Sequence, residues 1–215
     1  MLFVFSGLDC SGKSTQINLL RDYFTKNNKK CFVFWSRGGY TPAFQKLKDL
    51  LRRFSEKRLP HPGFSPQREK AFSNPFIRRV WLTIAILDLI YYYAFYLRLK
   101  KLLNYNIICD RYLMDTNIDF KLTYPHDETD KWFLWKLFKK VALRPNYHFV
   151  LTISVEESQK RSKLKNEPFP DSPEVLNYRL HKYLDYCENH KNVYHIKCNK
   201  SIEAVEKEIY SFINQ

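Results

Sequence analysis

The chain has 215 residues and a formal net charge of +14, with an isoelectric point near 9.5. This length suits one domain with a substantial core and is too short for two, so we expect a single domain over residues 1–215. The charge favours an anionic partner, but the cations are spread along the chain and form no unbroken basic tail, so we expect no nucleic-acid partner.

The N-terminal stretch combines a predicted strand with a glycine-rich turn. Residues 2–6 are apolar enough for a strand, and the sequence Gly-Leu-Asp-Cys-Ser-Gly-Lys-Ser-Thr at residues 7–15 separates them from an amphipathic helix. This spacing and context are typical of a phosphate-binding loop, whose backbone N–H groups and helix N-terminus surround the phosphates of a nucleotide. The alternative is an ordinary strand-to-helix turn with chance glycines. We expect the loop to bind ATP through Gly7, Cys10, Ser11, Gly12, Lys13, Ser14 and Thr15.

Two side chains of this loop have more specific predicted roles. Lys13 should reach the β- and γ-phosphates, and the Ser14 hydroxyl should ligate Mg²⁺. The next predicted strand, residues 31–35, runs into Ser-Arg-Gly-Gly. This order places Arg37 at the carboxyl end of a sheet, where ligands bind in open α/β folds. A glycine turn with a solvated arginine would have the same sequence.

The middle of the chain contains a basic segment and a long apolar helix. Residues 52–79 are rich in cations and prolines, so we expect a mobile insertion there. Residues 80–97 are nearly long enough to cross a bilayer, but Asp88 lies at their middle, where a charge is costly. We therefore expect no membrane partner and interpret this segment as a core helix or as the seam of a homodimer.

A short apolar strand at residues 107–109 delivers Asp110 and Arg111. An acidic residue at the end of a core strand suits Mg²⁺ or its water shell, and the adjacent arginine can neutralise a transferring phosphate. A structural salt bridge would look the same in sequence. Residues 113–143 then predict one helix, which ends before Pro145, and residues 147–153 predict another strand.

A capping box between Ser154 and Glu157 predicts the start of a cationic helix. Residues 160–173 continue with cations and then prolines, and we interpret them as a lid that closes over a phosphate chain, with a solvated basic face as the alternative. A helix at residues 176–186, a strand at 193–196 and a helix at 201–213 end the chain. His148 and His195 fall inside strand patterns, where core histidines are commoner than catalytic ones.

The order of elements and the use of cysteine indicate the class of protein. Strands alternate with helices throughout, so we expect an α/β fold with a mainly parallel sheet and helices on both faces. The five cysteines form no C-x-x-C pair and no zinc spacing, which is typical of reduced thiols. The apolar N-terminus is too short for a signal peptide, so we expect a cytoplasmic protein.

On these motifs the chain resembles the thymidylate kinase family of P-loop nucleoside monophosphate kinases over essentially its whole length. Residues 7–16 match the family's Gly-x-Asp-x-x-Gly-Lys-Ser-Thr-Gln loop, residues 110–112 match its Asp-Arg-Tyr motif, and residues 193–203 match its C-terminal close. The resemblance implies a three-layer P-loop NTPase fold. It also implies ATP- and Mg²⁺-dependent transfer of a phosphoryl group to a small-molecule acceptor, a nucleoside monophosphate such as dTMP.

The resemblance further implies the roles of site residues. Asp9 would lie near the sugar hydroxyl of the acceptor, and Arg37 and Arg111 would grip its phosphate. Because no arginine lies between Gly7 and Gly12, the lid would supply a cation, with Arg161 as first choice and Lys163 or Lys165 next. The expected catalytic residues are Lys13, Asp9, Arg111 and Arg161; the acceptor residues are Asp9, Arg37, Asp88, Arg111 and Asp115; the metal ligands are Ser14 and Asp110.

The acceptor pocket departs from the family. The family's base-contacting arginine falls at Leu89 here and its stacking phenylalanine near Ala85, so two contacts worth about 1 kcal/mol or more each are lost. Two alternatives stay open. The chain could be a kinase for another phosphorylated or hydroxyl-bearing metabolite, whose hydroxyls Asp115 and Asp119 would bind, or a non-catalytic nucleotide-binding module.

Overall fold

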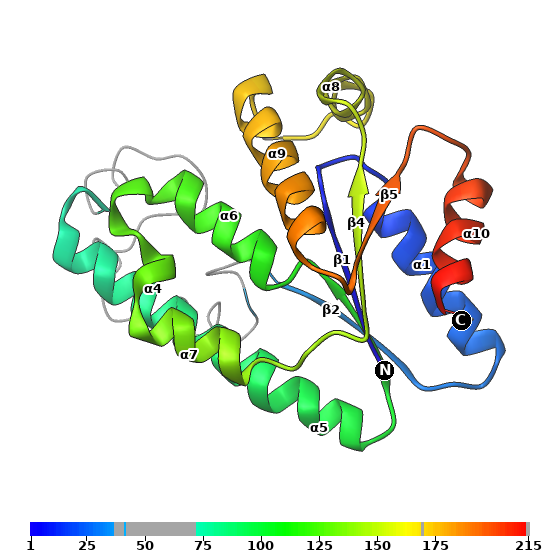
Figure 1. Cartoon of the computed structure of the whole chain (residues 1–215), viewed down its shortest axis with the longest axis horizontal. Helices are drawn as coiled ribbons and strands as arrows, with labels where there is room; N and C mark the ends of the chain where they lie inside the picture. The colour runs from blue at the N-terminus through cyan, green and yellow to red at the C-terminus, as the bar shows by residue number, and fades with distance from the viewer. Residues whose placement is uncertain (37–40, 42–71, 169, 214–215) are drawn as a thin grey trace.

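The computed structural model describes residues 1–36, 41, 72–168 and 170–213. Within these residues a five-stranded sheet, all parallel, has the strand order β2-β3-β1-β4-β5. Figure 1 shows α1 and α10 on one side of the sheet and α4 to α7 on the other, so the predicted three-layer α/β fold is confirmed. The strands are β1 Leu2–Gly7, β2 Cys31–Trp35, β3 Asn106–Asp110, β4 Tyr147–Thr152 and β5 Val193–Lys197. The helices are α1 Lys13–Lys26, α4 Pro75–Ile90, α5 Leu97–Leu102, α6 Leu113–Thr123, α7 Phe133–Val141, α8 Val155–Leu164, α9 Pro173–Asn189 and α10 Ile202–Ile213.

The alternation of side chains along β1 divides the core between the two faces of the sheet. Leu2 and Val4 belong to a cluster with buried residues of α4, α5 and α7. Phe3 and Phe5 belong to a second cluster with buried residues of α1, α9 and α10. Because β1 is buried on both faces, it reads as a continuous apolar run, as expected for the central strand of a parallel sheet.

The single helix predicted over residues 113–143 is wrong. The chain instead forms α6, two 3₁₀ turns at Pro125–Asp127 and Thr129–Lys131, and then α7. Pro125 cannot donate a backbone hydrogen bond, and Glu128 adopts a left-handed conformation with φ 42°, so a helix cannot continue through this segment. The apolar residues Trp135 and Phe138 are nonetheless buried, as their spacing predicted.

The predicted insertion at residues 52–79 ends too late. Residues 52–71 lie outside the described part of the chain, but α4 already begins at Pro75. The side chain of Asn74 caps this helix by accepting a hydrogen bond from the backbone N–H of Phe76 at 2.9 Å. Asn74-Pro75 is a typical helix start, with a capping residue followed by proline at the first helical position. The prediction instead treated Pro75 as one more proline of the insertion.

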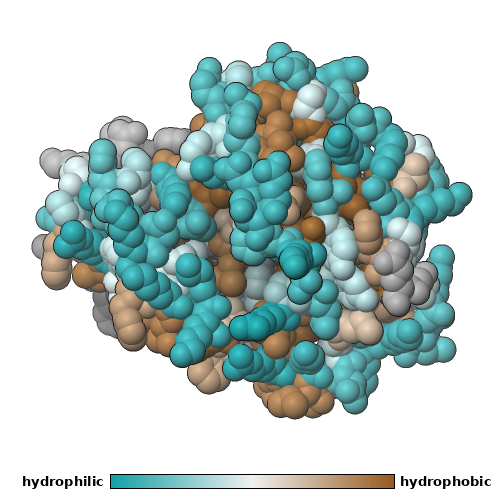
Figure 2. All heavy atoms as spheres, viewed as in Figure 1, coloured by the Kyte–Doolittle hydropathy of each residue, from teal (hydrophilic) through white to brown (hydrophobic). Residues whose placement is uncertain are grey.

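The long apolar helix continues from Pro75 to Leu102 through a π-helical segment, Tyr91–Tyr96. Among the described residues it alone has the length and apolar character of a membrane span, and 44 % of its most apolar window is buried in the protein. The same helix also carries exposed apolar side chains, among them Leu99 and Leu102 on α5. Figure 2 shows apolar atoms at the lower edge of the molecule, where Figure 1 places α5. The segment is thus partly a core helix, and one such helix is weak support for a membrane span.

Tyr93 fixes this long helix to the sheet near the carboxyl ends of β2 and β3. Its ring stacks on that of Tyr112 at 4.3 Å between centroids, and its hydroxyl forms a hydrogen bond with Ser36. Its backbone carbonyl accepts from the N–H of Leu143 at 2.9 Å. The three consecutive residues Tyr92, Tyr93 and Ala94 of the π-helical segment are all buried in the core.

Gly7 is the position where the sheet tolerates no side chain. A Cβ there would lie 2.0 Å from the backbone oxygen of Leu151 in β4, and φ is +138°. We expect Gly7→Ala to lower the free energy of unfolding by about 3 kcal/mol or more, because β1 and β4 would have to separate. Gly12→Ala is the matched control, since φ is +96° but a Cβ there would meet no atom within 4 Å; it should cost only about 1 kcal/mol. Denaturant unfolding of both variants measures the difference, and equal losses would contradict the steric explanation.

Candidate active site

The glycine-rich loop lies between the end of β1 and the start of α1. Gly12, at φ 96°, precedes the first turn of α1, and the N–H of Ser11 donates to the carbonyl of Leu8 at 3.3 Å. Lys13 turns back over the loop, and its Nζ donates to the backbone oxygens of Gly7 at 3.0 Å and Leu8 at 2.6 Å. Burial, and after it the positive charge of Arg111, lower the pKa of Lys13 to about 8. The loop therefore holds the ammonium group of Lys13 in surroundings that disfavour its positive charge, and a bound anion would stabilise that charge.

Asp110 and Arg111 lie beside this loop because β3 pairs with β1. The register sets Phe5 opposite Asp110, the last residue of β3, while β1 continues for two more residues to Gly7. Arg111 Nη2 lies 2.5 Å from Asp9 Oδ1 and forms an ion pair across the two strand ends. Burial tends to lower the pKa of Arg111, but Tyr183 and the carboxylates of Asp9 and Asp115 outweigh burial and raise it, so the guanidinium stays charged.

Two buried oxygens of this site lack hydrogen-bond partners in the described part of the chain: Asp110 Oδ1 and Ser11 Oγ. Burial raises the pKa of Asp110, and the nearby Lys13 opposes that rise. Ser14 is exposed on the first turn of α1. A hydroxyl and an unsatisfied carboxylate beside a lysine suit a hard cation such as Mg²⁺ together with phosphate oxygens. Within the described residues no group of three or more His, Cys, Asp or Glu could hold a metal ion.

Asp115 lies behind Arg111 and is only 1 % exposed. Its Oδ2 accepts from Ser6 Oγ at 2.5 Å and from the backbone N–H of Tyr112 at 2.8 Å, while its Oδ1 accepts from the hydroxyl of Tyr183 at 2.7 Å. Arg111 Nη1 lies 3.9 Å from the same Oδ1. The direct contact between Asp115 and an acceptor that the sequence suggested does not fit this burial. The carboxylate instead supports Arg111 from inside the protein.

Ser6, Tyr183 and His148 take part in this network, although none of them is expected at the site from the sequence. Ser6 Oγ lies 2.8 Å from His148 Nε2. The sequence does carry a signal for Ser6 and His148, because each is a polar residue within an otherwise apolar strand. The two strands, β1 and β4, pair with each other. Tyr183 gave no signal, since its place on α9 resembles that of any core aromatic residue. His148 is buried, as expected of a core histidine.

The predicted lid begins inside α8, and that helix already contacts the loop. Ser154 Oγ caps it by accepting from the N–H of Glu157 at 3.2 Å. Ser158 Oγ donates to the backbone oxygen of Asp9 at 2.8 Å, and Arg161 Nη1 donates to that of Cys10 at 3.4 Å. Arg161 Nε also donates to Glu157 Oε1 at 2.7 Å. The structure thus places Arg161 beside the glycine-rich loop, and its catalytic role stays a prediction.

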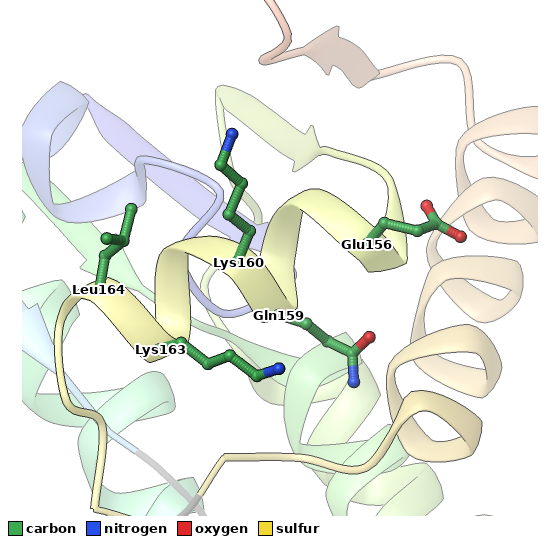
Figure 3. Close-up of a pocket in the computed structure, with 5 residues that line it drawn as sticks. All are labelled: Glu156, Gln159, Lys160, Lys163 and Leu164. Atoms are coloured by element: carbon green, nitrogen blue, oxygen red, sulfur yellow. The ribbon is translucent and has the colours of Figure 1, made fainter.

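The outer face of α8 carries an open hollow of about 430 Å³. Figure 3 shows Lys160 and Lys163 extending from different sides of the helix there. Arg161 is not among the lining residues, which are Glu156, Gln159, Lys160, Lys163 and Leu164. Among the three lid cations proposed from sequence, the contacts with the loop therefore favour Arg161 over Lys163.

The acceptor side is described only in part. Arg37 lies outside the described residues. Asp88 is half-buried on α4 and accepts a hydrogen bond from Thr41 Oγ1, on the side of the sheet where Tyr93 meets Ser36. Asp119, proposed from sequence as a ligand of sugar hydroxyls, is buried and pairs with Arg179 Nη1 at 2.7 Å. The structure therefore unites Asp9, Lys13, Asp110, Arg111 and Arg161, whereas Asp119 forms an ion pair with Arg179.

Comparison with known proteins relates the chain to one family. The family model described as thymidylate kinase matches residues 91–209. A probable thymidylate kinase of Methanocaldococcus jannaschii is 27 % identical over 214 residues, which covers 99 % of this chain and 95 % of the relative. A thymidylate kinase of Mycoplasmopsis pulmonis is 27 % identical over 227 residues, covering 99 % and 87 %. A thymidylate kinase of Kosmotoga olearia is 37 % identical over 60 residues, 28 % of each chain. The two longer matches include the glycine-rich loop, which the family-model match does not reach.

The buried imidazole of His148 predicts a loss of stability in acid. Burial lowers its pKa from 6.5 to about 4, so the unfolded chain binds more protons between these values and the stability present above pH 6.5 is lost as the pH falls. We expect His148→Gln, which keeps a group able to bond Ser6, to remove this dependence. Between pH 7 and pH 5 the unfolding free energy of the wild type should fall by about 2 kcal/mol more than that of the variant, measured by denaturant titration. Parallel curves for the two proteins would contradict the prediction, because they would mean that the pKa of His148 is the same in the native and the unfolded states.

Proposed function

This chain belongs to the thymidylate kinase family, and from that premise we propose that it transfers the γ-phosphoryl group of ATP, bound with Mg²⁺, to the phosphate of a nucleoside monophosphate. The observation that carries the proposal is the meeting of Lys13 in the loop with Asp110 and Arg111 at the end of β3. Donor and acceptor phosphates would have to approach each other between these groups. The proposal takes the protein to be cytoplasmic, in keeping with its five free cysteines.

The donor half of the reaction falls to the loop and α8. Lys13 would exchange the carbonyls of Gly7 and Leu8 for β- and γ-phosphate oxygens, and the phosphates would restore its full protonation. Ser14 and Asp110 would hold Mg²⁺, which when bound neutralises charge on the β- and γ-oxygens. Arg161 stands 3.4 Å from the backbone of Cys10 and would stabilise negative charge that builds up during transfer.

The acceptor half falls to Asp9 and Arg111. Arg111 would bind the acceptor phosphate, and Asp9 would accept a hydrogen bond from a sugar hydroxyl. An oxygen of the acceptor phosphate attacks the γ-phosphorus, the bond to the bridging oxygen of the β-phosphate breaks, and ADP leaves. The attacking oxygen is already ionised at neutral pH, so no side chain has to remove a proton. Asp9 therefore acts by position.

The two positions where the family contacts thymine give no support for a thymine base in the acceptor of this protein. Ala85 and Leu89, which replace the family's ring and arginine, are 1 % and 0 % exposed and belong to the core. Asp88, between them on α4, is the half-buried polar group of this turn. The alternative of a kinase for a different hydroxyl-bearing metabolite loses its support, because the carboxylates of Asp115 and Asp119 are occupied inside the protein.

The first experiment tests whether Lys13 serves transfer. We expect Lys13→Met to lower kcat at least about 10³-fold, because a cation that faces the transferring phosphate is lost. Its melting temperature should not fall, since Lys13 is a buried charge whose pKa is depressed. The control Lys26→Met, at the exposed end of the same helix, should keep wild-type turnover. Transfer at the wild-type rate by Lys13→Met would contradict the proposal. ATP binding by the wild type without acceptor-stimulated ADP release would favour a non-catalytic module.

The second experiment identifies the acceptor. A coupled assay of ADP release against a panel of nucleoside monophosphates should show stimulation by at least one of them. Because two thymine contacts are missing, we expect a preference for dTMP of less than about tenfold over the other bases. A strong preference for dTMP would show that other residues rebuild the thymine pocket.

A further inference from the structure

Arg111 is held between two carboxylates that differ in their surroundings. Its Nη2 lies 2.5 Å from Asp9 Oδ1, and its Nη1 lies 3.9 Å from Asp115 Oδ1. The side chain of Asp9 is 42 % exposed, whereas that of Asp115 is 1 % exposed. One partner is therefore open to exchange with solvent or a ligand, and the other is not.

The buried carboxylate is fixed by hydrogen bonds from three separate elements. Ser6 donates from β1 at 2.5 Å, the backbone of Tyr112 at the start of α6 at 2.8 Å, and Tyr183 from α9 at 2.7 Å. Turning Asp115 toward a ligand would leave these buried donors without their acceptor, and an unsatisfied buried donor is destabilising. Asp115 is thus the stationary member of the pair.

The backbone of Arg111 needs such a support. Its φ is 75°, a left-handed conformation that a non-glycine residue adopts at a cost, and its N–H donates to the carbonyl of Phe5 at 2.9 Å. A strained residue persists when its surroundings determine its position, and here the contacts come from β1 and from Asp115.

We propose that Asp115, held by Tyr183 and Ser6, is a positioning residue that keeps the Arg111 guanidinium in place while its outer nitrogen exchanges Asp9 for the acceptor phosphate. This inference rests on the proposed function. The incoming phosphate and the Asp9 carboxylate are both anions, so they cannot share Nη2 at short range without repulsion. When Asp9 releases the guanidinium, Asp115 remains as its counter-charge, and Asp9 becomes available to the sugar. A side chain held in this way loses little conformational entropy when the phosphate binds.

The test compares two tyrosines of the same helix. Tyr183→Phe removes the hydroxyl that holds Asp115, and Asp115→Asn removes the charge that faces Arg111. Tyr178→Phe is the control, because Tyr178 also lies on α9, packs against the core cluster there and has no part in this network. Steady-state kinetics with the best nucleoside monophosphate of the panel should show an acceptor KM raised about tenfold in Tyr183→Phe and more in Asp115→Asn. The KM for ATP should stay within about twofold of wild type in all three variants.

Calorimetry separates a loss of phosphate binding from a general loss of structure. The same monophosphate and its nucleoside, which lacks the phosphate, are titrated into each protein. We expect both network variants to lose affinity for the monophosphate by the same factor as in KM, with the affinity for the nucleoside unchanged. Equal losses for both ligands, or no loss for either, would overturn the inference.

The outcomes also separate this inference from the proposed function. A wild-type protein that transfers phosphate, beside network variants with normal acceptor KM, would overturn only the role of Asp115. A wild type that phosphorylates no monophosphate of the panel would overturn the proposed function and this inference with it. If Asp115→Asn does not fold, Tyr183→Phe decides the matter alone, since it deletes one oxygen and leaves the charge in place.

Discussion

The parallel pairing of β1 with β3 is the constraint on which the site depends. Because Phe5 lies opposite Asp110, β3 ends two residues before the end of β1, and Arg111 follows β3 close to the loop that follows β1. The ion pair between Asp9 and Arg111 joins these two segments, which are far apart in the sequence. A shift of this register by one residue would turn Arg111 to the other face of the sheet and separate it from the loop.

Much of the fold could be predicted because its signals are local. The strand-turn-helix at residues 2–24, the apolar strand before Asp110 and the caps at Ser154 and Ser201 depend on neighbours a few residues away, and the structure confirms each of these elements. The break near Pro125 and the start of α4 at Pro75 also depend on local residues. The prediction missed the break because apolar residues at helical spacing continue beyond it.

The burial of the polar residues could not be predicted from the sequence. Whether Asp115 faces a ligand or the core depends on Tyr183, which comes from a helix 68 residues further along the chain. Asp119 presents the same problem, since Arg179 reaches it from the same helix. A carboxylate one or two turns after a motif looks accessible in sequence, and only the packing of α9 against α6 shows that it is paired inside the protein. Of the residues expected at the site, Asp9, Asp110 and Arg111 lie at or near the end of a strand, and the structure brings them together.

The hydrogen bond from Ser158 to the backbone of Asp9 links two parts of the site. It ties α8 to the residue that also holds Arg111. A displacement of α8 that broke this bond would also loosen the peptide that carries Asp9, and with it the ion pair to Arg111. In the proposed reaction, the donor side and the acceptor side would therefore be coupled through a single hydrogen bond.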